Sequence, residues 1–188
     1  MGDYLRIIVV SDSHDNLFAV DEFLKSLGSI KPDLLIHLGD IVSPFTLKRF
    51  LDVGVRFTGV FGNNDGDRVK LKEMCSDLYE QPVITSIDGI HFVLFHGFGT
   101  PETTLRVVES LARSMPSGIV LYGHTHKWDL RMVGGAVIAN PGALSGYLSE
   151  VMSYLSMSLS GGKAVLEVRE LLTGKILGRL EYSVEEAS

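Results

Sequence analysis

The chain has 188 residues, of which 45% are apolar and 21% charged, with a net charge of −6 and one cysteine. This length fits one domain with a sizeable core, so we expect a single domain over residues 1–188. The apolar runs fall short of the ~18–20 residues that cross a bilayer, and MGDYLRIIVV lacks the features of a signal peptide. Scattered Lys and Arg argue against broad nucleic-acid or membrane binding. The lone Cys75 cannot form an internal disulfide, which favours the reducing cytoplasm.

The first half of the chain alternates strand-like and helix-like patterns. Three apolar runs are typical of strands covered on both faces, namely 5–10, 34–39 and 55–61. A helical pattern follows each of them, over 17–28, from Ser43-Pro44 onward, and over 67–78. Gly28 closes the first of these patterns. The βαβαβα order predicts a parallel sheet with right-handed crossovers.

The second half is richer in hairpin and turn signals. PVITSI and IHFVLF flank Asp88-Gly89, a strong hairpin signal, and Thr100-Pro101 opens a further helix. Strand-like segments follow at 118–123, 128–133, 135–139 and within 152–182. We therefore expect an α/β fold, a four-layer α/β/β/α sandwich of two stacked mixed sheets flanked by helices.

Polar side chains follow five of the predicted strands, at the point where each strand ends. These segments are Ser11-Asp12-Ser13-His14, Gly39-Asp40, Gly62-Asn63-Asn64-Asp65, His96-Gly97 and Gly123-His124-Thr125-His126. In an α/β sheet, ligands bind beyond the carboxyl ends of the strands, so these side chains should converge. A mixed nitrogen and oxygen set without thiolate suits Mn²⁺, Fe, Ni²⁺, Co²⁺ or Zn²⁺ better than Ca²⁺ or Mg²⁺ alone. The sequence thus predicts a shared metal site.

The motifs DSH, GD, GNND, HG and GHTH, in this order and at these intervals, resemble the calcineurin-like metallophosphoesterase superfamily. The small size and the segments IIVVSDSHDN, YGHTH and NPGALSGY look like its compact YfcE-type phosphodiesterase branch. That branch also includes the metal-site-bearing scaffold subunit of retromer. The resemblance covers nearly the whole chain except the first few and the last ~25 residues.

The resemblance implies a binuclear centre with seven ligands. Asp12, His14 and His126 would hold one ion, Asn63, His96 and His124 the other, and Asp40 would bridge them. The implied cofactor is two divalent ions, with Mn²⁺ the first choice and Ni²⁺, Fe²⁺, Co²⁺ or Zn²⁺ as alternatives. The implied reaction is hydrolysis of a phosphodiester by a hydroxide that bridges the two ions.

Three further residues of GNNDGDR are predicted to act at the site. Asn64 stands where many members of the superfamily carry a histidine, and an amide donates a hydrogen bond but delivers no proton at neutral pH. We therefore expect better turnover of diesters with good leaving groups than of alkyl monoesters. Asp65 is predicted to serve catalysis by orienting the loop or a ligand histidine. Arg68 is predicted to bind the substrate, with a surface helix residue as the alternative.

The resulting hypothesis is a cytoplasmic metal-dependent phosphodiesterase that acts on a small phosphodiester. The alternatives are a phosphomonoesterase or nucleotide hydrolase on the same centre, and a protein-binding scaffold that has lost catalysis. Exposed Phe45, Phe98 or Trp128 would serve such an interface or a homo-oligomer, and Trp128 could equally cap the active-site cleft. The complete ligand set favours the enzyme.

Overall fold

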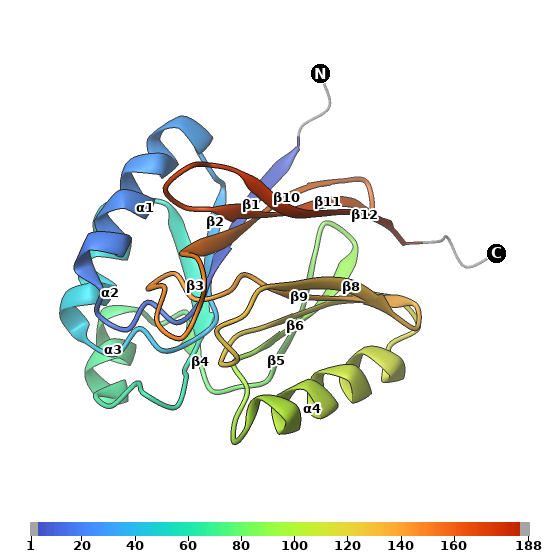
Figure 1. Ribbon diagram of the computed structural model, residues 1–188, viewed down its shortest axis with the longest axis horizontal. Coiled ribbons are helices and arrows are strands. Elements are labelled where there is room, and N and C mark those ends of the chain that lie inside the picture. Colours follow the sequence, from blue (N-terminus) through green and yellow to red (C-terminus); the bar gives the residue numbers. More distant parts are fainter. Residues whose placement is uncertain (1–3, 185–188) are drawn as a thin grey trace.

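The computed structural model describes residues 4–184, which form four helices and twelve strands in two sheets (Figure 1). The seven-stranded sheet has the order β12-β11-β10-β1-β2-β3-β4, with β1 (Leu5–Val10), β2 (Leu34–His37), β3 (Arg56–Val60), β4 (Leu78–Tyr79), β10 (Ser153–Ser160), β11 (Lys163–Glu170) and β12 (Ile176–Ser183). The five-stranded sheet has the order β5-β6-β7-β9-β8, with β5 (Val83–Ile87), β6 (Ile90–Phe95), β7 (Gly118–Tyr122), β8 (Asp129–Val133) and β9 (Ala136–Asn140). The helices are α1 (Leu17–Ile30), α2 (Pro44–Asp52), α3 (Arg68–Met74) and α4 (Pro101–Ser114).

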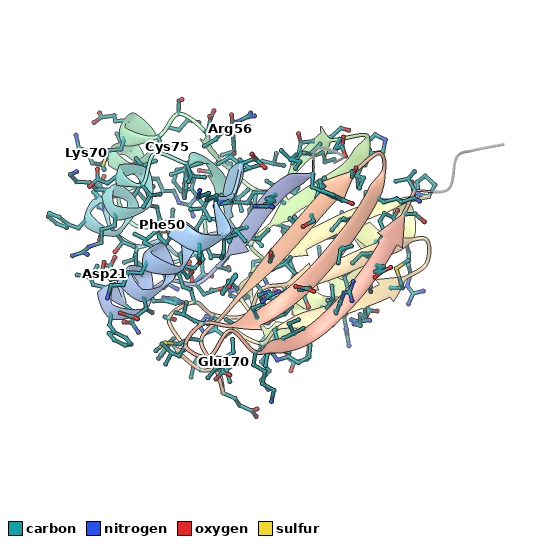
Figure 2. All side chains as sticks on the ribbon, turned by 90° about the horizontal axis from the view of Figure 1, so that it is seen from above. Asp21, Phe50, Arg56, Lys70, Cys75 and Glu170 are labelled. Atoms are coloured by element: carbon teal, nitrogen blue, oxygen red, sulfur yellow. The ribbon has the colours of Figure 1, made fainter. Side chains whose placement is uncertain are left out.

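Three buried apolar clusters separate four layers. The first lies between α1–α3 and the seven-stranded sheet, the second between the two sheets, and the third between the five-stranded sheet and α4. Figure 1 shows the same order, with α1–α3 on one side and α4 on the other. In Figure 2, Phe50 of α2 belongs to the first cluster and is fully buried. The predicted α/β/β/α sandwich is confirmed.

Both sheets are mixed, as predicted. Strands β1 to β4 run parallel, whereas β10 pairs antiparallel with β1. In the other sheet β6, β7 and β9 are parallel, and β5 and β8 are antiparallel edges. The hairpin at Asp88-Gly89 is confirmed, since Ile87 pairs with Ile90 on either side of it.

Two predicted helix ends were wrong. Gly28 does not close α1, which continues to Ile30 and ends at Lys31 in the left-handed conformation (φ 51°), directly before a proline that cannot continue a helix. The helix predicted over 67–78 stops at Met74. The chain then turns so that β4 can pair with the end of β3, a long-range contact that outweighs the helical pattern.

Candidate metal centre

The carboxyl ends of β1, β2, β3, β6 and β7 bring the predicted ligands together. One group contains Asp12, His14, Asp40 and His126, with one candidate ligand atom of each lying within 4.8 Å of all the others. Nε2 of His126 lies 3.3 Å from Oδ1 of Asp12 and 3.3 Å from Nε2 of His14. Nε2 of His14 lies 3.5 Å from Oδ2 of Asp40. These four side chains therefore surround one small space.

A second group lies on the other side of Asp40. Nε2 of His96 is 3.5 Å from Oδ1 of Asp40 and 3.0 Å from Oδ1 of Asn63. The ring of His124 packs edge-on against that of His96, with 5.2 Å between the centroids. Asp40 thus turns one carboxylate oxygen toward each group. Its two oxygens contact one histidine from each group.

Three of the four histidines are oriented by backbone carbonyls. Nδ1–H of His96 donates to Leu38 O at 2.7 Å, and Nδ1–H of His126 donates to Tyr147 O at 2.7 Å. Nε2–H of His124 donates to Gly99 O at 2.9 Å. Because a carbonyl can only accept, each ring in its neutral form has its proton on that nitrogen and presents a lone pair at the other. Histidines that ligate metals are held in this way.

The donor set fits a divalent cation. Oδ1 of Asp12 is buried and lacks a hydrogen-bond partner within residues 4–184, an arrangement that is costly without a cation. Burial opposes ionisation of Asp12, but the imidazoles of His126 and His14 outweigh it and hold the pKa of Asp12 well below its usual range. Burial likewise opposes protonation of His96, yet Asp40 and Asp12 raise its pKa. Asp12 is therefore an ionised carboxylate, and a metal ion or a protonated imidazole would balance its buried negative charge.

Backbone strain concentrates at the same residues. Asp12, His14, Asp40, His124 and His126 all have positive φ, between 44° and 65°. The left-handed region costs non-glycine residues free energy, of order 1–3 kcal/mol each, and persists only where surrounding contacts enforce it. Strain of this kind gathers at functional sites, which supports a function for this cluster.

Two glycines allow the loops of the site to approach each other. A Cβ on Gly62 would lie 2.2 Å from Oδ1 of Asp40, and one on Gly39 would lie 2.6 Å from the backbone N of Gly62. Gly39 also has φ 96°. Glycine is therefore required where the loop after β2 meets the loop after β3.

Asn64 and Asp65 both contact the bridging segment. Asn64 donates to both oxygens of Asp40, from its backbone N at 2.8 Å and from Nδ2 at 2.7 Å. The buried carboxylate of Asp65 accepts from the backbone N–H groups of Asp40 (3.1 Å), Val42 (2.7 Å) and Gly62 (2.6 Å). Asp65 therefore ties the loop after β2 to the loop after β3.

Arg68 is engaged within its own loop. Its guanidinium donates to Gly62 O at 2.7 Å and to Asp65 O at 3.2 Å, pairs with Glu80 at 2.8 Å, and lies over the ring of Phe61. These contacts hold the loop after β3 in place. They leave few N–H groups of the guanidinium free to contact a substrate. Its role in substrate binding stays a prediction.

His37 lies beneath the site and does not face it. Its Nδ1 accepts from Gly39 N at 3.2 Å, so its proton is on Nε2, which lies 3.0 Å from Ser13 Oγ. Burial lowers the pKa of His37 to about 3, so the ring is neutral. It supports the loops that carry Asp12 and Asp40.

The segment 141–147 has a role that sequence reasoning missed. Backbone N–H groups of Ala143, Leu144 and Ser145 donate to the carbonyls of His126, Ser11 and Asp12, respectively. This segment therefore joins the loop after β1 to the loop after β7. The run NPGALSGY marked it in the sequence, but nothing in the residue types showed that its backbone supports the ligands.

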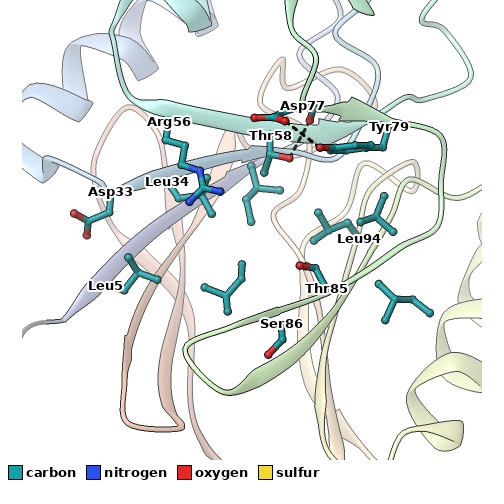
Figure 3. A pocket seen from close by; sticks show the side chains of 14 residues that line it. Leu5, Asp33, Leu34, Arg56, Thr58, Asp77, Tyr79, Thr85, Ser86 and Leu94 are labelled. Carbon is teal, nitrogen blue, oxygen red and sulfur yellow. Dashed lines mark hydrogen bonds between the residues drawn. The ribbon is translucent and has the colours of Figure 1, made fainter.

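A separate pocket of ≈ 360 Å³ opens between the two sheets, away from the ligands (Figure 3). Leu5 and Arg56, which begin β1 and β3, lie at its wall, whereas the ligands follow the carboxyl ends of those strands. Two hydrogen bonds to Asp77, from Thr58 and Tyr79, close one side of it. None of the seven predicted ligands lines this pocket.

Within residues 4–184, no helix is long and apolar enough to cross a membrane.

Comparison with known proteins identifies the family. The model of the calcineurin-like phosphoesterase superfamily domain matches residues 5–162, most of the chain. The chain therefore belongs to the calcineurin-like phosphoesterase superfamily, and it is a metal-dependent phosphoesterase, a hydrolase.

Individual relatives refine this placement. The phosphodiesterase MJ0936 of Methanocaldococcus jannaschii is 32% identical over 152 residues, which cover 78% of this chain and 89% of that protein. The E. coli phosphoesterase YfcE superposes with a TM-score of 0.71 at 22% identity, covering 93% of this chain and 98% of YfcE. Vps29 (vacuolar protein sorting 29) of Cryptosporidium parvum superposes with a TM-score of 0.73 at 21% identity, over 96% and 99% of the two chains. The predicted resemblance to the YfcE-type branch and its retromer relative is confirmed.

Proposed function

We propose that this phosphoesterase is a phosphodiesterase that uses two divalent ions, most readily Mn²⁺, and acts on a small phosphodiester. The observation that carries the proposal is that the two oxygens of Asp40 face two different groups of imidazoles, and three of these four rings are oriented by backbone carbonyls. The name of the archaeal relative, a phosphodiesterase 32% identical to this chain, supports the choice of a diester.

The residues of each group have distinct tasks in this proposal. Asp12, His14 and His126 would hold one ion, Asn63, His96 and His124 the other, and Asp40 both. Bound ions supply a water of lowered pKa as nucleophile and neutralise charge on the phosphoryl oxygens. Asp12 and Asp40 bring the only formal charges of the ligand set, −2 against the +4 of two ions. The site keeps a net positive charge that suits a phosphate anion, although the chain carries −6 overall.

Asn64 limits the range of leaving groups. Both donors of Asn64 point at the carboxylate of Asp40, so the residue holds that carboxylate in place. An amide cannot protonate a departing alkoxide, and general acid help is worth ~10²–10⁴-fold. The enzyme should therefore hydrolyse diesters of acidic alcohols, such as aryl esters, faster than alkyl diesters or monoesters.

The test is hydrolysis of bis-p-nitrophenyl phosphate by metal-stripped protein resupplied with Mn²⁺, alongside Asp40→Asn and the matched control Asp52→Asn. Asp52 is exposed and, among residues 4–184, forms its ion pair with Lys48 on the same helix, so its variant should keep full activity. Loss of a residue that merely supports a ligand costs 10–100-fold, so Asp40→Asn should lose at least about 100-fold. Equal rates in the two variants would refute the proposed centre.

The same experiment weighs the enzyme against the scaffold alternative. Metal bound at two equivalents without turnover, under Mn²⁺, Ni²⁺, Fe²⁺ or Co²⁺, would favour a protein-binding role. The superposition on Vps29 supports a shared fold and does not favour either function. Residence in the cytoplasm and self-association stay predictions, which fractionation and light scattering would test.

A further inference from the structure

A cavity of ≈ 470 Å³ adjoins the metal centre on the side of His14. It is lined by His14, Asn16, Ser145, Gly146 and Tyr147. The amide of Asn16 donates to Ser145 O at 2.9 Å, so the start of α1 and the segment after β9 form one continuous wall. A group attached to a phosphate at the metal centre would have room here.

The backbone and the side chain of Tyr147 serve different purposes. Its carbonyl accepts from Nδ1 of His126, and its N–H donates to Ser145 Oγ at 3.2 Å. The residue is 58% exposed, and neither of these hydrogen bonds involves its side chain. The backbone alone therefore fixes the ligand histidine, and the phenol ring is not needed for that task.

The ring of Tyr147 nevertheless stands at the centre itself. It meets the ring of His14 edge-on, with 5.5 Å between centroids, and lies 5.6 Å from that of His126. An isolated exposed aromatic residue needs no explanation. Tyr147 differs because it stands between two ligand imidazoles and a cavity that opens beside them. Its position suits contact with a planar group, because aromatic rings stack on one another and bury apolar surface in doing so.

We propose that Tyr147 is a platform on which a planar aromatic ring of the substrate stacks, so that the preferred phosphodiester carries a nucleobase or a similar aromatic group. This inference rests on the proposed function, since the phosphate must lie at the metal centre for the ring to reach the cavity. Stacking of a base on an aromatic side chain contributes about 5- to 100-fold in affinity.

The test compares two sugar phosphates, one with a base and one with a hydroxyl group in its place. Thymidine 5′-phosphate and 2-deoxyribose 5-phosphate are titrated calorimetrically into the Mn²⁺-loaded protein, and the ratio of their Kd values is the readout. We expect thymidine 5′-phosphate to bind about 5- to 100-fold more tightly. We expect the ratio to fall to near one in Tyr147→Ala and to persist in Tyr147→Phe.

Leu148→Ala is the matched control, because Leu148 is the next residue, is 70% exposed and lines a different cavity. Metal content measured for every variant shows whether Tyr147→Ala has kept its centre. A ratio near one in the unmodified protein overturns the proposal, and so does a ratio that survives in metal-loaded Tyr147→Ala.

Hydrolysis of bis-p-nitrophenyl phosphate by the same preparations reports separately on the proposed function. If the protein hydrolyses this diester but the Kd ratio is near one, the stacking proposal is refuted and the proposed phosphodiesterase activity is retained. A base preference that depends on Tyr147, in protein that binds metal without turnover, supports the stacking platform and refutes the proposed phosphodiesterase activity.

Discussion

Replacing Asp65 by asparagine should destabilise the protein although the two side chains have nearly the same shape. The Asp65 carboxylate is only 4% exposed and accepts three backbone N–H groups, from Asp40, Val42 and Gly62. Oδ2 accepts two of them and Oδ1 the third. An amide has one acceptor oxygen, so in either orientation its NH₂ group faces at least one of these N–H groups.

The size of the effect follows from that count. A hydrogen bond to a charged group contributes about 1.5–3 kcal/mol, and a buried donor left without a partner costs about 1–3 kcal/mol. Asp65→Asn should therefore lower the free energy of unfolding by about 2 to 5 kcal/mol. For a chain of this length, the Tm should fall by at least about 4 °C.

Asp67→Asn provides the control, because it is the same chemical change two residues away. Asp67 caps α3 by accepting from Lys70 N at 3.2 Å, and asparagine caps helices equally well, so its cost should stay within about 0.5 kcal/mol. Urea unfolding of the metal-free proteins measures both variants. Equal midpoints and slopes for Asp65→Asn and Asp67→Asn would refute the assignment of Asp65 as the clamp between the two loops.

Three further predictions concern the metal centre. Gly62→Ala should lose metal and at least about 100-fold in turnover, because its Cβ would lie 2.2 Å from Asp40 Oδ1, whereas Gly66→Ala, with nothing within 4 Å, should behave as the unmodified protein. The raised pKa of His96 in the metal-free protein means that metal must displace a proton, so metal affinity should rise with pH through and above 6.5; a pH-independent affinity by calorimetry would contradict this. Asn64→His should speed hydrolysis of alkyl diesters by up to about 10²–10⁴-fold and change aryl diesters far less, and equal effects on both would argue against a missing general acid.

The sequence was sufficient to predict the layers and the polar side chains that lie together at one edge of the sheets. Continuous apolar runs marked the buried strands, and the polar residues after them lie together because parallel strands end at one edge of a sheet. The errors occurred where long-range contacts decide. The pattern over 67–78 predicts one helix. In the structure Leu78 lies in β4 and pairs with Gly59 of β3, a partner that local spacing does not reveal.

The supporting contacts of the site were the least predictable part. His96, His124 and His126 donate to the carbonyls of Leu38, Gly99 and Tyr147, and every residue has a carbonyl, so no residue type marks these partners. The identity of Tyr147 becomes informative only when its side chain is seen beside His14. A motif thus predicts which side chains meet, whereas their orientation depends on backbone geometry that only the fold supplies.

The metal-free site is costly for the fold in several ways at once. Five of the predicted ligands adopt left-handed backbone conformations, a carboxylate oxygen of Asp12 is buried without a hydrogen-bond partner in the described part of the chain, and Nε2 of His14 and of His126 face each other at 3.3 Å. The strained backbone and the unpartnered carboxylate oxygen oppose folding, and the gathered carboxylate and imidazole atoms fit a cation that accepts their lone pairs. Since a ligand that binds only the native state stabilises it, divalent metal should restore part of this stability. The features that make the site costly without metal are therefore the same features that select for metal, and the surrounding clamps, Asp65 and the segment 141–147, hold the ligands in position before it binds.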